Sequence, residues 1–189
     1  MDPDHVRSAD VIESLPARES PTESAWERFE ALYRSSRNDL YAYVMTLLRD
    51  QAAAEDVTAL TFERAYRRRR TFDRRRGEER AWLFGIARNA ALDELRHRSR
   101  RAQLVVDPAD PATESAAHQD DPEVALRRTA VRAAMAQLAG REREMIALKF
   151  HGGMSNAEIA RVLGVSESNA GTLLYRTMEK LRRACDATA

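Results

Sequence analysis

The chain has 189 residues and a net charge of +1, and 43% of its residues are hydrophobic although only 6% are aromatic. This length suits one domain or two small ones, and a core built mainly from Leu, Ala, Val and Ile indicates an all-α fold. The single cysteine, Cys185, excludes a disulfide framework or a cysteine-based metal cluster within the chain. Because no apolar run approaches ~20 residues and the acidic N-terminus does not resemble a signal peptide, we expect a cytoplasmic protein without membrane insertion.

Charge is segregated along the chain, although the two signs nearly cancel overall. The net charge is −4 over residues 1–24, +6 over 25–102, −6 over 103–124 and +5 over 125–189. Two basic blocks separated by an acidic strip favour two nucleic-acid-facing domains joined by a linker. The alternative interpretation is a solvated Arg/Glu surface on ordinary helical bundles.

Two segments are expected to lie outside the folded domains. Residues 1–24 contain three prolines and no periodicity, which predicts a disordered tail, with a regulatory or processed arm as the alternative. Residues 103–123 contain three more prolines and only acidic charges, which predicts a flexible acidic linker. The helical domains are therefore expected at residues 25–102 and 124–189.

The first domain is expected to begin with two helices. One starts near Trp26, and the next runs from about residue 52 to 70 after a break at Asp50 and Gln51. We expect the aromatic residues of the first helix to lie in the core rather than on a stacking platform. The apolar positions are Trp26, Phe29, Leu32, Tyr33, Leu40, Tyr41, Val44, Leu47 and Leu48, then Ala54, Val57, Leu60, Thr61, Phe62 and Ala65.

A cationic loop at about residues 71–79 leads into a long helix that reads RAWLFGIARNAALDELRHRSRR. Arginine forks suit phosphates and base edges, so the basic residues here are candidate DNA contacts. Trp82 and Phe84 could stack on unpaired bases, and a buried role for each is the alternative. The apolar stripe is Leu83, Ile86, Ala87, Ala90 and Leu95; the polar candidates are Arg74, Arg75, Arg76, Arg80, Arg88, Asn89, Arg96 and Arg98.

The second domain is expected to end in a helix-turn-helix. Helices are predicted from about residue 124 and over 141–150, and the stretch SNAEIARVLGVSESNAGTLLYRTMEKLRR follows. Ser155 and Glu158 have capping-box spacing, Gly164 suits a left-handed turn, and Ser166 can cap the next helix. Such a motif places its second helix in the DNA major groove, whereas the alternative is an ordinary helical hairpin.

The outer face of that second helix supplies the candidate DNA-reading residues. With Ala170, Leu174, Thr177 and Leu181 facing inward, the helical wheel turns a short polar row outward, and such side chains can hydrogen-bond base edges. The row is Ser168, Asn169, Thr172, Tyr175 and Arg176.

Three stretches together resemble the sigma-70-type initiation factors of bacterial RNA polymerase, specifically the small extracytoplasmic-function group. AEDVTALTFERAYRR (54–68) is similar to that family's core-binding helix, and FDRRRGEERAWLFGIARNAALDELRHR (72–98) to its promoter-melting and −10-reading segment. LAGREREMIALKFHGGMSNAEIARVLGVSES (138–168) looks like its −35-reading domain.

The resemblance implies an initiation factor that is not itself an enzyme and needs no cofactor or metal. It implies core polymerase binding around Glu55, Asp56, Thr58 and Phe62, and promoter DNA binding by both domains. A cationic loop beside a rigid helix can hold the displaced strand, which offsets the few kcal/mol needed to unstack a base. The family also implies a protein inhibitor, an anti-sigma factor, as a partner.

Four residues depart from the family pattern. Ala59 and Leu60 stand where Gln-Glu is common in the core-binding helix, and Gly171 and Leu173 stand where Lys and Arg are common in the recognition helix. Those polymerase and phosphate contacts are therefore not expected from these positions.

Two other functions remain open from the residues. A conventional helix-turn-helix regulator explains the second domain but not the first. A helical metal-dependent hydrolase is weakly supported, because the four histidines form no HxxxH pair and Glu55 and Asp56 diverge on a helix.

Overall fold

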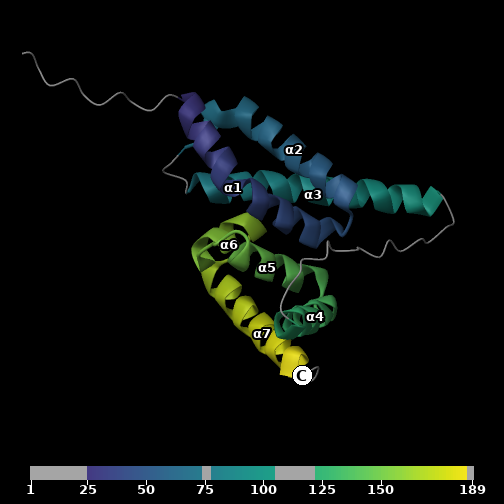
Figure 1. Ribbon diagram of the computed structural model, residues 1–189. Helices are drawn as coiled ribbons and strands as arrows, with labels where there is room; N and C mark the ends of the chain where they lie inside the picture. The colour runs from purple at the N-terminus through teal and green to yellow at the C-terminus, as the bar shows by residue number, and fades with distance from the viewer. Residues whose placement is uncertain (1–24, 74–77, 105–121, 187–189) are drawn as a thin grey trace, which may run out of the picture.

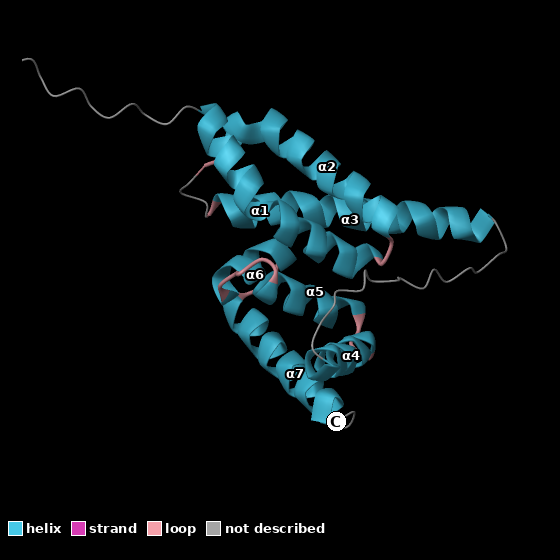
Figure 2. Cartoon of the chain, in the orientation of Figure 1, coloured by secondary structure: helices cyan, strands magenta, loops and turns pink. Residues whose placement is uncertain are grey.

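The computed structural model describes residues 25–73, 78–104 and 122–186, and these residues form helices with no strand among them (Figure 2). The all-α expectation is confirmed. The tail at 1–24, most of the linker, and Arg74, Arg75 and Arg76 lie outside the described residues. The elements are α1 (Ala25–Leu48), α2 (Gln51–Arg68), the 3-10 turn η1 (Arg69–Thr71), α3 (Glu79–Leu104), α4 (Pro122–Ala136), α5 (Gly140–Phe150), α6 (Asn156–Leu163) and α7 (Glu167–Asp186).

Helices α1, α2 and α3 pack on one another and form the first domain. The chain reverses between α1 and α2 at Arg49, which has a positive φ of 53°, and Asp50 then caps α2 by accepting from the backbone N–H of Ala53 at 2.9 Å. Leu40, Val44 and Leu83 are buried between the three helices. Sequence periodicity therefore located both the break and the core of this domain.

The aromatic residues of α1 do not all lie in the core, which corrects the expectation for two of them. Trp26 is 58% exposed and Tyr33 is 39% exposed. They pack edge-on against rings of α2 at the rim of the domain, Trp26 on Tyr66 and Tyr33 on Phe62, rather than inside the core. The ring that fills the core from α1 is Tyr43, which the helical stripe did not include.

Helices α4 to α7 form the second domain, and α6 and α7 make the helix-turn-helix. The Ser155 hydroxyl accepts from the Glu158 N–H at 3.3 Å, and the Glu158 carboxylate accepts from the Ser155 N–H at 2.8 Å. Gly164 ends α6 in the left-handed region at φ 68°, where a side chain would be strained. Ser166 then accepts from the Asn169 N–H, so the predicted capping box, turn glycine and second cap are all confirmed.

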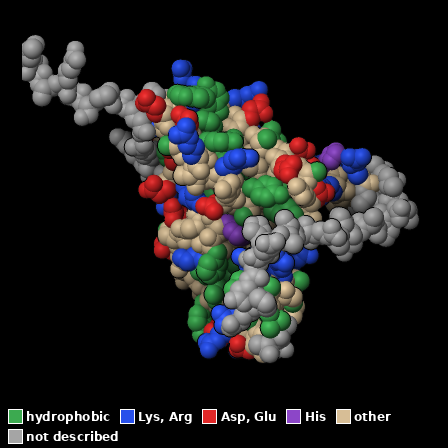
Figure 3. Space-filling view, viewed as in Figure 1, with side chains coloured by type: hydrophobic (Ala, Val, Ile, Leu, Met, Phe, Trp, Pro, Cys, Tyr) green, Lys and Arg blue, Asp and Glu red, His purple; other side chains and the backbone are tan. Residues whose placement is uncertain are grey.

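The two domains lie directly against each other, an arrangement that the sequence did not predict. Helix α5 packs on α1, and α6 packs on α3 (Figure 1). One buried apolar cluster runs across the junction, from Tyr43 and Phe84 in the first domain to Met145, Leu148 and Met154 in the second. Basic and acidic side chains are interspersed over the visible surface of both domains, so this face is not one continuous basic field (Figure 3).

Candidate polymerase and nucleic-acid interfaces

The outer face of α7 is open to solvent along the whole predicted row. Ala170 and Thr177 are buried against the rest of the domain, as the helical wheel predicted. The Thr177 hydroxyl is satisfied inside the helix, because it donates to the Leu173 carbonyl at 2.8 Å. The exposed row consists of Ser168, Asn169, Thr172, Tyr175 and Arg176.

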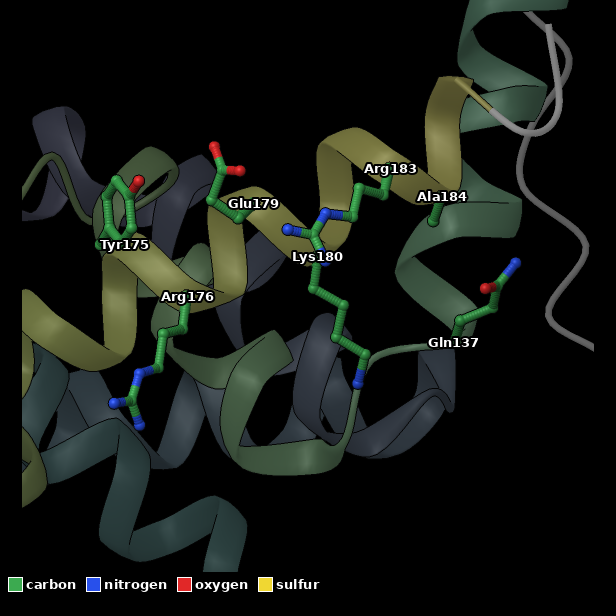
Figure 4. Close-up of a pocket in the computed structure, with 7 residues that line it drawn as sticks. All are labelled: Gln137, Tyr175, Arg176, Glu179, Lys180, Arg183 and Ala184. Carbon is green, nitrogen blue, oxygen red and sulfur yellow. The ribbon is translucent and has the colours of Figure 1, made fainter.

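A shallow groove of about 620 Å³ lies beside this row, between α7 and the α4–α5 connection (Figure 4). Tyr175 and Arg176 project from α7 in different directions, and Arg176 forms no ion pair with any described residue. Lys180, which also lines the groove, is bound to Glu142 of α5 at 2.7 Å. The hydrogen bond from Lys180, followed by that from the Ala139 N–H, lowers the pKa of Glu142. Arg176 is thus the basic residue of this row, and its guanidinium remains available to contact DNA.

All three guanidinium nitrogens of Arg80, at the start of α3, donate hydrogen bonds to other residues of the chain. Its guanidinium binds Asp39 at 2.6 Å and also donates to Ser35 and Ser36 of α1. On the other side it donates to the carbonyls of His151 at 3.0 Å and Gly152 at 2.7 Å, in the loop between α5 and α6. One predicted DNA residue therefore ties α1 and α3 to the second domain.

Arg88 is engaged in the same way about two turns further along α3. Its Nε lies 2.6 Å from Oε1 of Glu144 on α5, and the Glu144 side chain is only 7% exposed. The Tyr43 hydroxyl donates to the same oxygen at 3.2 Å. Burial, and then the negative charge of Glu144, raises the pKa of Tyr43 well above its ordinary value, so the hydroxyl keeps its proton and remains a donor.

Asn89 is exposed and lines a groove of about 430 Å³ between the domains. Phe72 and Trp82 line the same groove with ring centroids 5.3 Å apart, and Arg161 and Val162 of α6 form its other side. Phe84 is fully buried against Tyr43, so of the two aromatic residues considered for base stacking only Trp82 has an accessible ring. An aromatic pair beside an amide can hold a base by stacking and by edge hydrogen bonds.

The last two basic candidates on α3 lie away from the domain junction. Arg96 is exposed and pairs with Asp93 at 3.0 Å on its own helix. Arg98 pairs with Glu94 and reaches Asp50, the capping residue of α2, at 3.2 Å. Surface pairs of this kind contribute little to stability and exchange readily for other partners.

Three of the four predicted polymerase-binding residues line a groove of about 790 Å³ between α1 and α2. Glu55 is exposed at its edge, whereas Thr58 and Phe62 are mostly buried in its floor. Asp56 is also exposed but does not line the groove. The Thr58 hydroxyl has no hydrogen-bond partner within the described residues.

The sequence interpretation missed the α1 side of this groove. Tyr33 and Tyr41 were assigned to the core, and Arg37 and Asn38 were not singled out, yet all four line it. The available signal was the placement of polar Arg37 and Asn38 between the two tyrosines, because polar residues interleaved with tyrosine are typical of a binding surface rather than a core. Of the residues that line the interdomain groove, Arg68 on α2 was not assigned a role although it lies in a run of four arginines at 67–70, and Arg161 on α6 was missed because no motif marks it.

Within residues 25–73, 78–104 and 122–186, no group of three or more His, Cys, Asp or Glu side chains could hold a metal ion. Over the same ranges no helix combines the length and apolar character needed to cross a bilayer.

Comparisons with known proteins match both domains to one family. The family model for sigma-70 region 2 covers residues 32–101, and that for sigma-70 region 4 covers residues 128–181. The ECF RNA polymerase sigma factor SigL of Mycobacterium tuberculosis is 35% identical over 80% of this chain and 85% of its own length. The ECF RNA polymerase sigma factor BldN of Streptomyces coelicolor is 32% identical over 96% of this chain and 67% of its own. Among solved structures, the sigma factor RpoE of Bartonella quintana, in complex with the anti-sigma factor NepR, has the same fold, with a TM-score of 0.70 at 21% identity over 85% of this chain and 98% of that one.

Proposed function

This chain belongs to the extracytoplasmic-function sigma factors of bacterial RNA polymerase, and we propose how its two domains divide promoter recognition between them. As a sigma factor it directs RNA polymerase to promoters and is not itself an enzyme. A conventional helix-turn-helix regulator would not account for the region 2 match. The observation that carries the proposal is the row of exposed polar residues on α7, the second helix of a fully capped helix-turn-helix.

We propose that α7 reads the −35 element. Ser168, Asn169, Thr172, Tyr175 and Arg176 would lie in the major groove, where hydroxyl, amide and guanidinium groups distinguish base pairs. Arg176 would supply the bidentate contact to a guanine, because its fork pairs with none of the described residues. The other four residues would fix the position of α7 along the groove and make additional contacts to DNA.

We propose that α3 and the loop before it read and open the −10 element. The arginines at positions 74–76 and 80 would bind phosphates of the displaced strand, together with Arg88, Arg96 and Arg98. Asn89 and Trp82 would hold an unstacked base on the α3 side of the groove that they line. In this structure the two domains lie against each other, and Arg80 and Arg88 are bound to the second domain. A role of these two arginines in DNA binding therefore requires the domains to move apart.

We propose that core polymerase binds at the groove between α1 and α2. Glu55 and Asp56 would pair with basic residues of polymerase, while Phe62 and the neighbouring Tyr33 supply apolar contact and Thr58 gains a hydrogen-bond partner. The chain would act in the cytoplasm, where polymerase is found.

A protein inhibitor is also part of the proposal. The chain has a polymerase-binding groove on one domain and a DNA-reading helix on the other, and a helical partner that contacts both would block both activities. The fold is the one that RpoE of Bartonella quintana adopts with an anti-sigma factor. Recovery of only polymerase subunits from unstressed cells, with no stoichiometric small partner, would contradict this part.

The domain limits are proposed as 25–102 and 124–189, with residues 103–123 as the connection. Limited proteolysis should cut within 103–123 and leave two helical fragments. Cuts confined to residues 1–24, with one protected fragment spanning the rest, would contradict separate domains.

Run-off transcription with purified core polymerase and a genomic promoter library tests the function directly. The wild-type chain should produce transcripts from a subset of promoters that share −35 and −10 sequences. Replacing both Glu55 and Asp56 by Arg should abolish transcripts and core binding, whereas Glu63→Arg, which changes an exposed carboxylate further along the same helix, should not. Transcripts at wild-type level from the double variant would remove this groove from the polymerase interface.

A further inference from the structure

The groove of about 430 Å³ between the domains has the dimensions of a small-molecule site. One face of α3 forms its floor, because Trp82, Gly85 and Asn89 follow one another at intervals of three and four residues. Two arginines also line it, Arg68 from α2 and Arg161 from α6. The groove therefore combines an apolar floor with cationic groups from both domains.

Gly85 of the groove floor is a glycine that packing within the protein does not require. It lies in the interior of α3, where glycine costs about 1 kcal/mol of helix stability relative to alanine. A Cβ at this position would meet no atom of a neighbouring element within 4 Å, whereas a Cβ on Gly152 would overlap the Leu148 carbonyl oxygen. The missing side chain of Gly85 thus leaves room in the groove rather than in the core.

The spacing along the floor suits a planar base. Trp82 and Asn89 are seven residues apart, about 10 Å along the helix axis, and Gly85 lies between them. The Trp82 ring, with the Phe72 ring at a centroid distance of 5.3 Å, offers a face for stacking. An asparagine amide can bond to both N6 and N7 of adenine, so the floor favours adenine over the other bases.

The charged residues of the groove complement the rest of a nucleotide. Arg68 and Arg161 are exposed, and guanidinium forks suit phosphate oxygens. Asp73 and Glu78 are exposed carboxylates that line the same groove, and such groups accept hydrogen bonds from ribose hydroxyls. The groove therefore carries a partner for each part of an adenine ribonucleotide.

We propose that this groove binds a free adenine nucleotide, with the base stacked on Trp82 over Gly85 and its edge bonded to Asn89. Arg161 binds the phosphate, and Val162 beside it on α6 adds apolar contact, so the ligand touches both domains. The site shares its floor with the unstacked DNA base of the proposed function. It does not depend on that role, because the free nucleotide also uses the arginine of α6.

The test is a titration of the full chain with adenosine monophosphate, followed by tryptophan fluorescence. The background variant is Trp26→Phe, which leaves Trp82 as the single indole of the chain. Adenosine monophosphate should quench this fluorescence saturably and bind at least about tenfold more tightly than guanosine monophosphate or inorganic phosphate, all at equal ionic strength.

Gly85→Ala separates a ligand site from a structural role, because its two expected effects have opposite signs. Thermal stability should rise, since alanine is the better helix former, while affinity for adenosine monophosphate should fall at least about tenfold, since the Cβ occupies the place of the base. Arg161→Ala should weaken binding of adenosine monophosphate but not of adenosine, which lacks the phosphate. Arg182→Ala removes the same charge from an exposed position on α7 and should change neither.

Two results would overturn the proposal. One is quenching that does not saturate or that adenosine and guanosine monophosphates produce equally; the other is wild-type affinity for adenosine monophosphate in Gly85→Ala. Failure of the proposed −10 role is a different result: single-stranded DNA would bind equally well with and without Asn89→Ala, while adenosine monophosphate still bound the unsubstituted groove.

Discussion

The two candidate DNA-binding faces differ in how much of their bonding capacity the folded chain already uses. On α3, Arg80 and Arg88 are bound to the second domain, whereas on α7 Arg176 lies in an exposed row and pairs with none of the described residues. Both sets contain arginines that lie off an apolar helical stripe, so a helical wheel predicts solvent exposure for all of them. The difference arises from the contact of α5 and α6 with the first domain, which no local pattern reveals.

Under the proposed function, the face of α7 proposed to read the −35 element is exposed in this structure, whereas the arginines of α3 proposed to bind the −10 element are occupied by the second domain. Substitutions on and around each face test this difference.

Gly152→Ala should have the largest effect on stability, because it changes the loop whose carbonyls bind Arg80. A Cβ at this position would overlap the Leu148 carbonyl oxygen, and the Gly152 carbonyl itself accepts from Arg80. We expect a loss of about 3 kcal/mol in the free energy of unfolding, measured by urea denaturation.

Gly153→Ala is the matched control for that change. Its φ of +65° strains any other residue, but no neighbouring atom lies within 4 Å of the place that a Cβ would take, so we expect a loss of only about 1 kcal/mol. Equal losses for the two variants would show that the Gly152 contact with α5 is not tight.

Arg176→Ala tests the open face. If Arg176 contacts a guanine edge, promoter affinity measured by fluorescence anisotropy should fall by about 1–3 kcal/mol, and discrimination at one base pair should weaken. Arg182→Ala removes the same charge from an exposed position on the same helix and should change affinity less. Unchanged promoter affinity would remove Arg176 from the site.

Ser155→Ala tests whether the helix-turn-helix depends on its capping box. The substitution removes the acceptor for the Glu158 N–H and a donor to the Glu158 carboxylate, so stability should fall by about 1 kcal/mol. Thermal unfolding gives the measurement, with Ser99→Ala on the exposed side of α3 as the control. A change no larger than that of the control would count against the cap.

The smallest effect expected is a dependence of stability on pH through His151, at the junction between the domains. Burial lowers the pKa of His151, with Asp39 opposing it in part, and the neighbouring Arg80 binds both the His151 carbonyl and Asp39. The unfolded chain therefore takes up the proton first, and stability should fall as pH drops below about 6.5. His151→Gln should flatten the profile between about pH 7 and 5.5, whereas His97→Gln, at an exposed position of α3, should not; equal slopes in all three chains would contradict this origin.

Local physics made most of the fold predictable. Capping residues, the left-handed Gly164 and the apolar stripes located the helices of both domains, because these signals act within one or two helical turns. The exposed row on α7 followed from the same periodicity. The rim position of Trp26 and Tyr33 could not be predicted, because periodicity identifies a helix face but not how far the neighbouring helix extends over it.

The site on α3 was predictable only in its residue types. Arg80 and Arg88 could be named as candidates from composition and from family resemblance, but their partners lie 41 to 72 positions away along the chain. The sequence did not predict a role for Glu144, because a glutamate on a charged helix is normally exposed. Its burial depends on a contact between domains that neither domain encodes alone.

The distance between the domains, measured before and after core polymerase binds, shows whether Arg80 and Arg88 leave the second domain when the factor engages polymerase. With spin labels on Cys185 and Ala52→Cys, the free factor should give one short, narrow distance distribution. Addition of core polymerase should shift it to longer distances, because Arg80 and Arg88 must leave the second domain to reach DNA. An identical distribution in the free factor and in the polymerase complex would show that the domains do not separate.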